Sequence, residues 1–230
     1  MDLMKSELFY KLKNMMNPEH KKKDFSFYVH KIKKIAPLSF ALLGEEFFAS
    51  VLPQYFAEVV INEENLTENI FYFPLFVRKY QTKFDIQDYV VELIDYEFTK
   101  FQIEIDPTPL HLALYNQTTS NVYMNPLAQA IRHEYDIHEY VLNFQKKLSK
   151  PLLPKKNPTL LLASKNPETN QVIFFKGNIH HAAIIDELHD GKISKKNLLQ
   201  TLQTKYATTA QSVWVIALNE LKANFFILES

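Results

Sequence analysis

The sequence predicts a mostly helical α+β protein with two domains. Apolar residues recur at helical spacing through most of the chain before residue 145. Two short apolar runs, residues 159–163 and 171–175, indicate strands, and three amphipathic segments follow them. Residues 150–158 are rich in proline and lysine, a composition typical of a linker. We therefore expect a mainly helical domain over residues 1–149 and a small α+β domain over residues 159–230.

Three helical regions are expected in the N-terminal domain. The first starts at Pro37 and carries a broad apolar stripe that extends to Phe56. Pro53 lies within it and should kink or split the helix, because its ring clashes with the preceding turn and its nitrogen donates no hydrogen bond. The second and third regions cover residues 66–80 and 87–101, where apolar residues again recur at helical spacing.

Weaker signals surround these three regions. Apolar residues up to Met16 indicate a helix that ends at Asn17, before Pro18. Residues 110–115 alternate weakly between apolar and polar side chains, as a short strand would. Residues 125–144 combine an extended start with a helical end, so this part of the N-terminal domain is expected to contain some strand.

The C-terminal domain has a clear order of elements. The two strands are joined by a turn-rich segment, and a short helix, His181–His189, follows and is closed by Gly191. Ser194 and Thr208 can cap two further helices, and a final apolar stub is present at Phe225–Leu228. Strand, strand, helix, helix, helix, strand is the outline of a compact winged-helix domain. Such domains usually bind a peptide or a nucleic acid.

Composition limits the possible partners. Lys+Arg and Asp+Glu number 26 each, so the chain as a whole has no net attraction for DNA or for an anionic membrane. There is no cysteine and there are only three glycines, which excludes disulfides and glycine-rich phosphate loops. No apolar run approaches the roughly 18–20 residues that span a bilayer, and lysines interrupt the N-terminal segment where a signal peptide would lie. We expect a cytoplasmic protein with no membrane partner.

The titratable residues give little indication of catalysis. His181 and His189 would lie about 12 Å apart along one helix, too far to share a metal ion. The remaining histidines have no metal-ligand spacing, and no serine or lysine nucleophile motif is present. Glu97 lies on a helix that also presents apolar residues, where a buried structural hydrogen bond is its expected role. We therefore predict no catalytic residues, no metal site and no cofactor, in a protein that is not an enzyme.

Four segments in order carry a family resemblance. They read APLSFALLGEEFF at 36–48, LTENIFYFPLFV at 66–77, YVVELIDYEF at 89–98 and NPLAQAIRHEYDIHEY at 125–140. Together they resemble the bacterial HvfC-like and MbnC-like proteins, whose N-terminal domain is often described as DNA-binding. The resemblance implies an accessory protein that forms a complex with a TIM-barrel, multinuclear iron enzyme and helps it hold a short, ribosomally made precursor peptide.

The C-terminal domain separately resembles PqqD-like peptide-recognition domains. The matching parts are the hairpin, residues 184–191, the helix capped by Ser194, and the last helix with residues 224–227 after it. In such a domain an extended peptide can add to an exposed sheet edge, here residues 171–176. The predicted peptide-binding residues are Val172, Ile173, Phe174 and Phe175 on this strand, with Val213, Trp214, Ala217 and Leu218 flooring an adjacent groove. The alternative for the residues of the last helix is that they belong to the core.

DNA binding is the competing hypothesis, in which the protein is a transcriptional regulator. The residues that would contact phosphates and base edges are Lys192, Lys195, Lys196, Asn197 and Gln200. Against this, the last helix, residues 210–221, is nearly free of positive charge, and the basic residues form no continuous stripe. An enzyme with an unrecognised site is a third possibility. We favour a non-catalytic binding protein.

Overall fold

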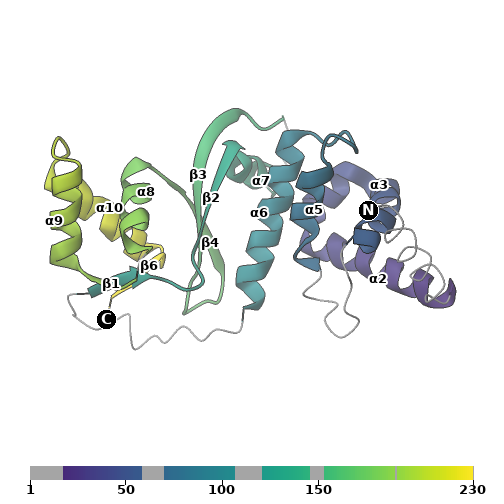
Figure 1. Ribbon diagram of the computed structural model, residues 1–230, viewed down its shortest axis with the longest axis horizontal. Coiled ribbons are helices and arrows are strands. Elements are labelled where there is room, and N and C mark those ends of the chain that lie inside the picture. The colour runs from purple at the N-terminus through teal and green to yellow at the C-terminus, as the bar shows by residue number, and fades with distance from the viewer. Residues whose placement is uncertain (1–17, 59–69, 107–120, 146–152, 190, 230) are drawn as a thin grey trace, which may run out of the picture. The chain divides into compact units, whose positions relative to one another are not determined.

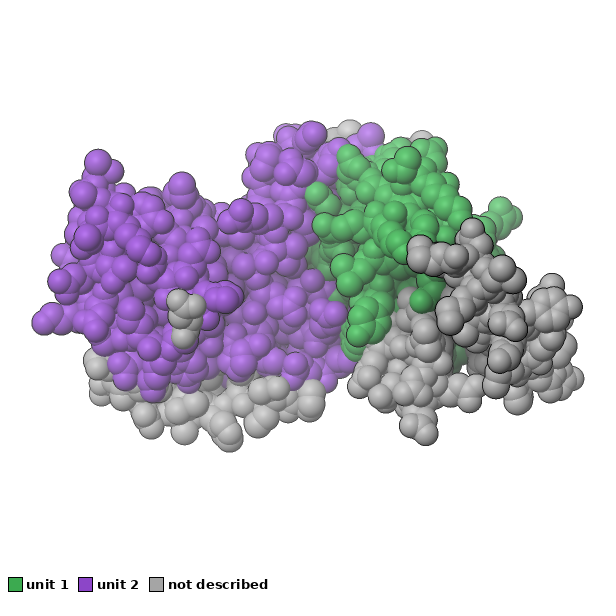
Figure 2. All heavy atoms as spheres, viewed as in Figure 1, with its two compact units in different colours: residues 1–98 green, residues 99–230 purple. Residues whose placement is uncertain are grey.

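A computed structural model describes residues 18–58, 70–106, 121–145, 153–189 and 191–229. The fold is mixed and mostly helical, with two small antiparallel sheets (Figure 1), so the predicted class is confirmed at this level. The chain divides into two compact units, unit 1 with residues 1–98 and unit 2 with residues 99–230 (Figure 2). Each unit is described separately below.

The regular elements in the described part of unit 1 are helices. They are α2 (Pro18–Ile35), α3 (Pro37–Glu58), α5 (Phe73–Tyr80) and the larger part of α6 (Asp88–Ile105). Their apolar faces meet in a core rich in aromatic rings. The ring of Phe73 stacks between those of Phe48 and Phe98, with a centroid distance of 6.0 Å to each. The helices predicted from Pro37 and over residues 87–101 are therefore present.

Helix α3 is interrupted at a different residue from the one predicted. Gly44 has φ 78° and ψ 162°, which is not helical, and it separates two helical parts. A side chain disfavours this positive φ, so glycine is well suited to the position. Pro53 lies inside the second part of the helix. The interruption therefore falls at Gly44, nine residues before the proline that was expected to cause it.

Glu97 connects α6 to the first turn of α3. Its carboxylate accepts hydrogen bonds from the main-chain N–H of Leu38 at 2.8 Å and of Ser39 at 3.0 Å, and from the Ser39 hydroxyl at 2.6 Å. The first N–H groups of a helix have no partner within it, and a negative charge suits this positive end of the helix. Glu97 and Ser39 are both buried. The predicted role of Glu97 as a buried hydrogen-bond acceptor is confirmed.

Unit 2 contains both sheets, and all neighbouring strands in them are antiparallel. One sheet has the order β2-β3-β4, with β2 (Gln129–Tyr135), β3 (Lys156–Lys165) and β4 (Val172–Gly177). The other has the order β5-β1-β6, with β5 (Ile193–Ser194), β1 (Asn121–Met124) and β6 (Ile227–Glu229). The middle strand of the second sheet thus comes from a segment about 70 residues earlier in the chain than β5.

Four helices complete unit 2: α7 (Ile137–Gln145), α8 (Ile179–Leu188), α9 (Lys195–Lys205) and α10 (Gln211–Ala223). The buried faces of α8, α9 and α10 form one apolar core together with side chains from β1, β3 and β6. Ser194 caps α9 by accepting the N–H of Asn197, and Gly191 has a positive φ of 120° after α8, both as predicted. The predicted strands and helices after residue 158 are present in the predicted order, with the short strand β5 as an addition between α8 and α9. The prediction that Thr208 caps the last helix is wrong, because the N-cap of α10 is Ala210 and no side chain caps it.

The β3–β4 hairpin turn is fixed by Asn166. Its side-chain oxygen accepts the N–H groups of Glu168 at 2.8 Å and Thr169 at 3.2 Å, an Asx turn. Asn170 has a positive φ of 58°, a conformation that asparagine tolerates better than most residues. The turn therefore has the chemistry that the sequence indicated between the two apolar runs.

The predicted domain boundary at residues 150–158 differs from the division found in the structure. Strand β2 precedes this segment and β3 follows it, yet the two pair along most of their length, from Gln129 opposite Ala163 to Tyr135 opposite Lys156. Residues 156–158 are themselves part of β3. Main-chain hydrogen bonds across the proposed linker therefore hold both sides in one unit, and the division lies between Phe98 and Thr99.

Lys165 secures the end of α6 within unit 2. This lysine is only 9% exposed, and its ammonium group donates to the main-chain oxygens of Glu104 at 3.2 Å and Asp106 at 3.3 Å. The last carbonyls of a helix have no partner within it, and the helix dipole places negative charge there. A cation from β3 is therefore well placed to stabilise the final turn of α6.

Some predictions concern residues outside the described ranges. These are the helix before Asn17, the start of the second helical region at residues 66–69 and the short strand at residues 110–115. Among the helices that the structure describes, none combines the length and the apolar character that crossing a membrane requires.

Candidate functional site

Strand β4 forms one edge of its sheet. It pairs with β3, from Val172 opposite Lys165 to Gly177 opposite Leu160, and with no other strand in the described ranges. The sequence-based expectation that residues 171–176 contain an edge strand is met. An edge strand presents main-chain N–H and C=O groups that can pair with a further strand.

The side chains of β4 are anchored on both faces of the sheet. On one face the ring of Phe174 lies 6.0 Å from that of His138, and Lys176 Nζ is 2.7 Å from the carboxylate of Asp136. On the other face the ring of Phe175 lies 5.8 Å from that of His181. The four residues Val172–Phe175 are each half-buried. The main chain of β4 is therefore held in place by side chains from other elements of unit 2.

The second half of the predicted peptide site is corrected by the structure. Trp214, Ala217 and Leu218 are at most 3% exposed and belong to the core cluster, and Val213 is half-buried. Trp214, Ala217 and Leu218 face α8 and α9, because α10 turns its apolar face inward. These three residues support unit 2 as core residues and do not form the floor of an open groove beside β4.

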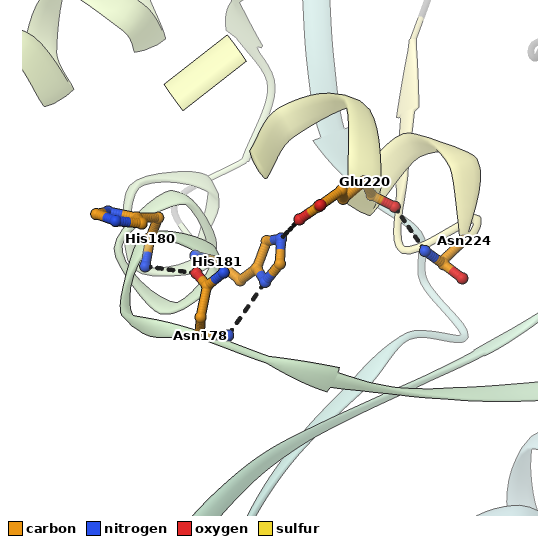
Figure 3. A network of polar contacts seen from close by, with 5 residues as sticks. All are labelled: Asn178, His180, His181, Glu220 and Asn224. Carbon is orange, nitrogen blue, oxygen red and sulfur yellow. Dashed lines mark hydrogen bonds and ion pairs between the residues drawn. The ribbon is translucent and has the colours of Figure 1, made fainter. Parts of the chain in front are cut away.

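The junction between β4 and α8 contains a network of polar contacts (Figure 3). Asn178 directly follows β4, and its side-chain oxygen accepts the N–H groups of His180 at 2.9 Å and His181 at 3.1 Å. The Nδ1 atom of His181 in turn accepts the N–H of Asn178 at 3.1 Å. This reciprocal arrangement is a capping box in which asparagine and histidine take the usual places of serine or threonine and of glutamate or glutamine.

His181 also connects α8 to α10. Its Nε2 atom lies 2.9 Å from a carboxylate oxygen of Glu220, as Figure 3 shows. Because Nδ1 accepts a hydrogen bond, the neutral ring carries its proton on Nε2, which faces the carboxylate of Glu220. Burial lowers the pKa of His181 below its ordinary value, and the attraction of Glu220 for the protonated ring offsets this only in part. His181 is therefore neutral at pH 7.

A second histidine near β4 behaves in a similar way. Burial is the main cause that lowers the pKa of His138, and the positive charge of Lys176 lowers it further. Asp136 and Glu139 act in the opposite direction. Each face of β4 thus packs against a histidine ring whose neutral form is favoured.

The residues proposed for DNA contacts lie around the start of α9. The Lys192 ammonium lies 5.8 Å from the centre of the Tyr123 ring, and Lys195 lies 3.8 Å from the Glu229 carboxylate. Lys196, Asn197 and Gln200 are exposed. The outer face of α10 has Ile216, which is 58% exposed, and its lysine, Lys222, pairs with Glu229 at 2.5 Å. The electrostatic pattern of α10 does not resemble that of a helix that enters a DNA groove.

A shallow groove of about 700 Å³ lies between β1 and the end of α8. Its walls are mainly apolar and include Met124, Ala128, Ile185 and Leu188, with Lys192 at the side. The sequence reasoning missed this feature, because β1 is only four residues long and has no clear alternation. Among the lining residues, only Lys192 had been proposed for a contact with a partner.

Within the described ranges, no three histidine or carboxylate side chains gather closely enough to hold a metal ion. Both ring nitrogens of His181 lie against other protein groups, Nδ1 against the Asn178 N–H and Nε2 against the Glu220 carboxylate. Its geometry corresponds to a structural role at the β4–α8 junction.

No family model matches this chain, and no curated protein matches it. The geometry of unit 2 and the resemblances in the sequence are the observations that bear on function.

Proposed function

We propose that this protein is a non-catalytic accessory protein that binds an extended peptide along the edge of β4. The observation that carries the proposal is the position of β4 at the edge of its sheet, with its side chains packed on both faces. A peptide that pairs with such an edge gains main-chain hydrogen bonds, and the side chains beside it set its register. Because β4 is held in place before binding, little ordering of the protein would oppose the association.

The connectivity of unit 2 is consistent with a variant winged-helix domain. The elements α8, β5, α9, α10 and β6 follow one another as in that outline, and β5 and β6 flank a third strand. In this chain the third strand is β1, which precedes the others in sequence. We infer that the domain keeps the winged-helix arrangement while taking its central strand from an earlier segment.

The partners follow from the resemblance to the HvfC-like and MbnC-like proteins. We propose that the peptide is a short, ribosomally made precursor and that the protein presents it to a TIM-barrel, multinuclear iron enzyme. On this view the chemistry belongs to the enzyme and the present chain contributes binding alone. We also propose a cytoplasmic location, where such a precursor is made.

DNA binding remains the competing proposal because Lys196, Asn197 and Gln200 are exposed on α9. It is less well supported, since a protein that binds duplex DNA needs several cations on the surface that meets the phosphates. The exposed face of α10 presents the uncharged Ser212, Ile216 and Asn219 together with one carboxylate, Glu220, and one lysine, Lys222, that pairs with Glu229. Such a surface favours contact with a protein or a peptide.

The proposed site can be tested with a peptide selected from a display library of short random sequences. Proline at Ile173 and proline at Phe174 form a matched pair, because successive N–H groups of a strand point to opposite edges. The variant in which proline removes an N–H that points to β3 should lose a hydrogen bond between the two strands and unfold. The other should stay folded and lose affinity for the peptide by about tenfold or more, as expected for one main-chain hydrogen bond.

Two results would contradict the proposal. One is a folded proline variant that binds the selected peptide as tightly as the unaltered protein does. The other is salt-dependent retardation of a duplex DNA probe by the full chain, with no peptide selected, which would favour the regulator instead. Co-expression with a TIM-barrel iron enzyme and its precursor peptide, followed by co-purification, tests the identity of the partners.

A further inference from the structure

We propose that His181 is the positioning residue that holds the end of β4 in its peptide-binding arrangement, and that the edge loses affinity when Nδ1 of His181 takes up a proton. The inference rests on the proposed function in one respect, namely that the β4 edge binds a peptide. The positioning role itself concerns contacts within unit 2 and can be measured without any peptide.

The hydrogen bond of His181 lies where β4 ends and α8 begins. Nδ1 of His181 accepts the N–H of Asn178, which is the first residue after β4. Asn178 is also the N-cap of α8, and its side chain accepts two N–H groups of the first turn of that helix. One imidazole nitrogen therefore fixes the main chain at the point where the edge strand ends and the helix begins.

Side chains pack tightly around the junction of β4 and α8. A Cβ atom on Gly177 would lie 2.9 Å from Cδ2 of Leu160 and 3.0 Å from Cδ1 of Leu162, so β4 approaches β3 closely here. The ring of Phe175 meets the ring of His181 edge-on, with an interplanar angle of 85°. A displacement of His181 would therefore be transmitted to β4 in two ways. One is the ring contact with Phe175, and the other is the hydrogen bond to the main-chain N–H of Asn178 at the end of the strand.

Protonation of the His181 ring changes the hydrogen bonds that it can make. The neutral ring has one acceptor, Nδ1, which accepts the N–H of Asn178, and one protonated nitrogen, Nε2, which lies 2.9 Å from the Glu220 carboxylate. In the protonated ring both nitrogens are donors, so Nδ1–H would face the N–H of Asn178 and this hydrogen bond would be lost. The contact with Glu220 would remain and would strengthen. Protonation thus breaks the hydrogen bond to Asn178 at the end of β4 and keeps the contact with Glu220 of α10.

Two titratable side chains in the described part of the chain act on the charge of His181. Glu220 from α10 favours the protonated ring, whereas His180, its neighbour in α8, disfavours it. Phe175 from β4 contacts the ring of His181 and carries no charge. The strongest influence is burial, which lowers the pKa of His181. Loss of the Asn178 bond is therefore expected below the ordinary histidine pKa of about 6.5.

The first experiment uses the full chain without peptide. The ¹⁵N chemical shifts of the His181 ring should show an unprotonated Nδ1 and a protonated Nε2 at neutral pH. Acidification should protonate Nδ1 and speed hydrogen exchange at the Asn178 amide. The His180→Gln variant should keep both changes, because its main-chain contact with Asn178 is unaffected. A protonated Nδ1 at neutral pH, or no change in Asn178 exchange when the ring titrates, would overturn the positioning role.

The second experiment measures affinity for the library-selected peptide at about pH 7.5 and at a pH below the His181 ring transition found in the first experiment. The unaltered protein should lose about tenfold, the equivalent of one hydrogen bond. His181→Gln should bind as well at both values, since glutamine at this capping-box position accepts the same N–H and does not titrate. Glu220→Gln should move the loss to lower pH, because the carboxylate no longer favours the protonated ring.

The two experiments separate the possible failures. Absence of peptide binding at neutral pH, with the expected ring shifts, would refute the proposed function and leave His181 as a structural cap. Peptide binding that falls with acid equally in the unaltered protein and in His181→Gln would refute the role of His181 and leave the function standing. A rise in the transition pH for Glu220→Gln would contradict the assigned proton positions.

Discussion

The buried carboxylate of Glu97 allows the most direct test of how unit 1 is stabilised. Glu97→Ala removes the acceptor for two N–H groups at the start of α3 and for the Ser39 hydroxyl. Ser39 is fully buried, so its N–H and hydroxyl would be left without partners where water does not reach them. Leu38 is half-buried, and water can compensate its N–H in part.

The expected cost follows from these three contacts. An unsatisfied buried donor costs about 1–3 kcal/mol, and a bond to a charged acceptor contributes toward the upper end of that range. Relief from burying the carboxylate offsets part of the loss. We expect Glu97→Ala to lower the free energy of unfolding by about 3 kcal/mol, whereas Ser39→Ala, which loses only the hydroxyl bond, should cost about 1 kcal/mol.

The assay is urea unfolding followed by far-UV circular dichroism, with the slope m checked for a change in the exposed surface. Glu46→Ala is the matched control, because Glu46 is an exposed carboxylate at the middle of α3 and should change stability by less than about 0.5 kcal/mol. A loss below about 0.5 kcal/mol for Glu97→Ala, or a larger loss for Ser39→Ala than for Glu97→Ala, would refute the reasoning.

Three further predictions concern unit 2. Lys165→Met should lower the free energy of unfolding by about 1 kcal/mol, because the thioether keeps the bulk of the stem but cannot donate to Glu104 and Asp106; unchanged urea stability would count against the capping role. Gly177→Ala should cost about 1–2 kcal/mol in the same assay, since the added methyl forces Leu160 and Leu162 to move, and a stabilised variant would contradict the observed close approach. The free energy of unfolding should also fall as the pH drops below about 6.5, because folding lowers the pKa values of His138 and His181 and the unfolded chain then binds more protons. Urea midpoints that do not fall with acid would contradict this prediction. Midpoints that fall as steeply in His181→Gln as in the unaltered protein would contradict the part assigned to His181.

Local features of unit 2 could be predicted because their signals lie within a few residues of one another. The Asx turn at Asn166, the cap at Ser194 and the positive φ at Gly191 each depend on one residue and its immediate neighbours. The helical spacing of apolar residues likewise located α6 to within a few residues. In each case local chemistry and the final fold agree.

Long-range pairing could not be predicted in this way. Strand β2 pairs with β3 across a segment that contains Pro151 and Pro154, and local periodicity does not identify the partner of a strand. The apolar stripe around Trp214 is the same whether it faces a groove or a core, so the pattern alone could not exclude a surface role. The capping box of Asn178 and His181 departs from the usual residues and therefore gave no recognisable signal.

The β5-β1-β6 sheet bears on how this chain can be shortened. Strands β5 and β6 have two and three residues, and each pairs with β1 and with no other strand in the described ranges. A recombinant fragment that starts at residue 159 would contain both outer strands and lack the one between them, along with the β2 partner of β3. Any truncation intended to retain the C-terminal helices in their native setting should therefore begin upstream of Asn121.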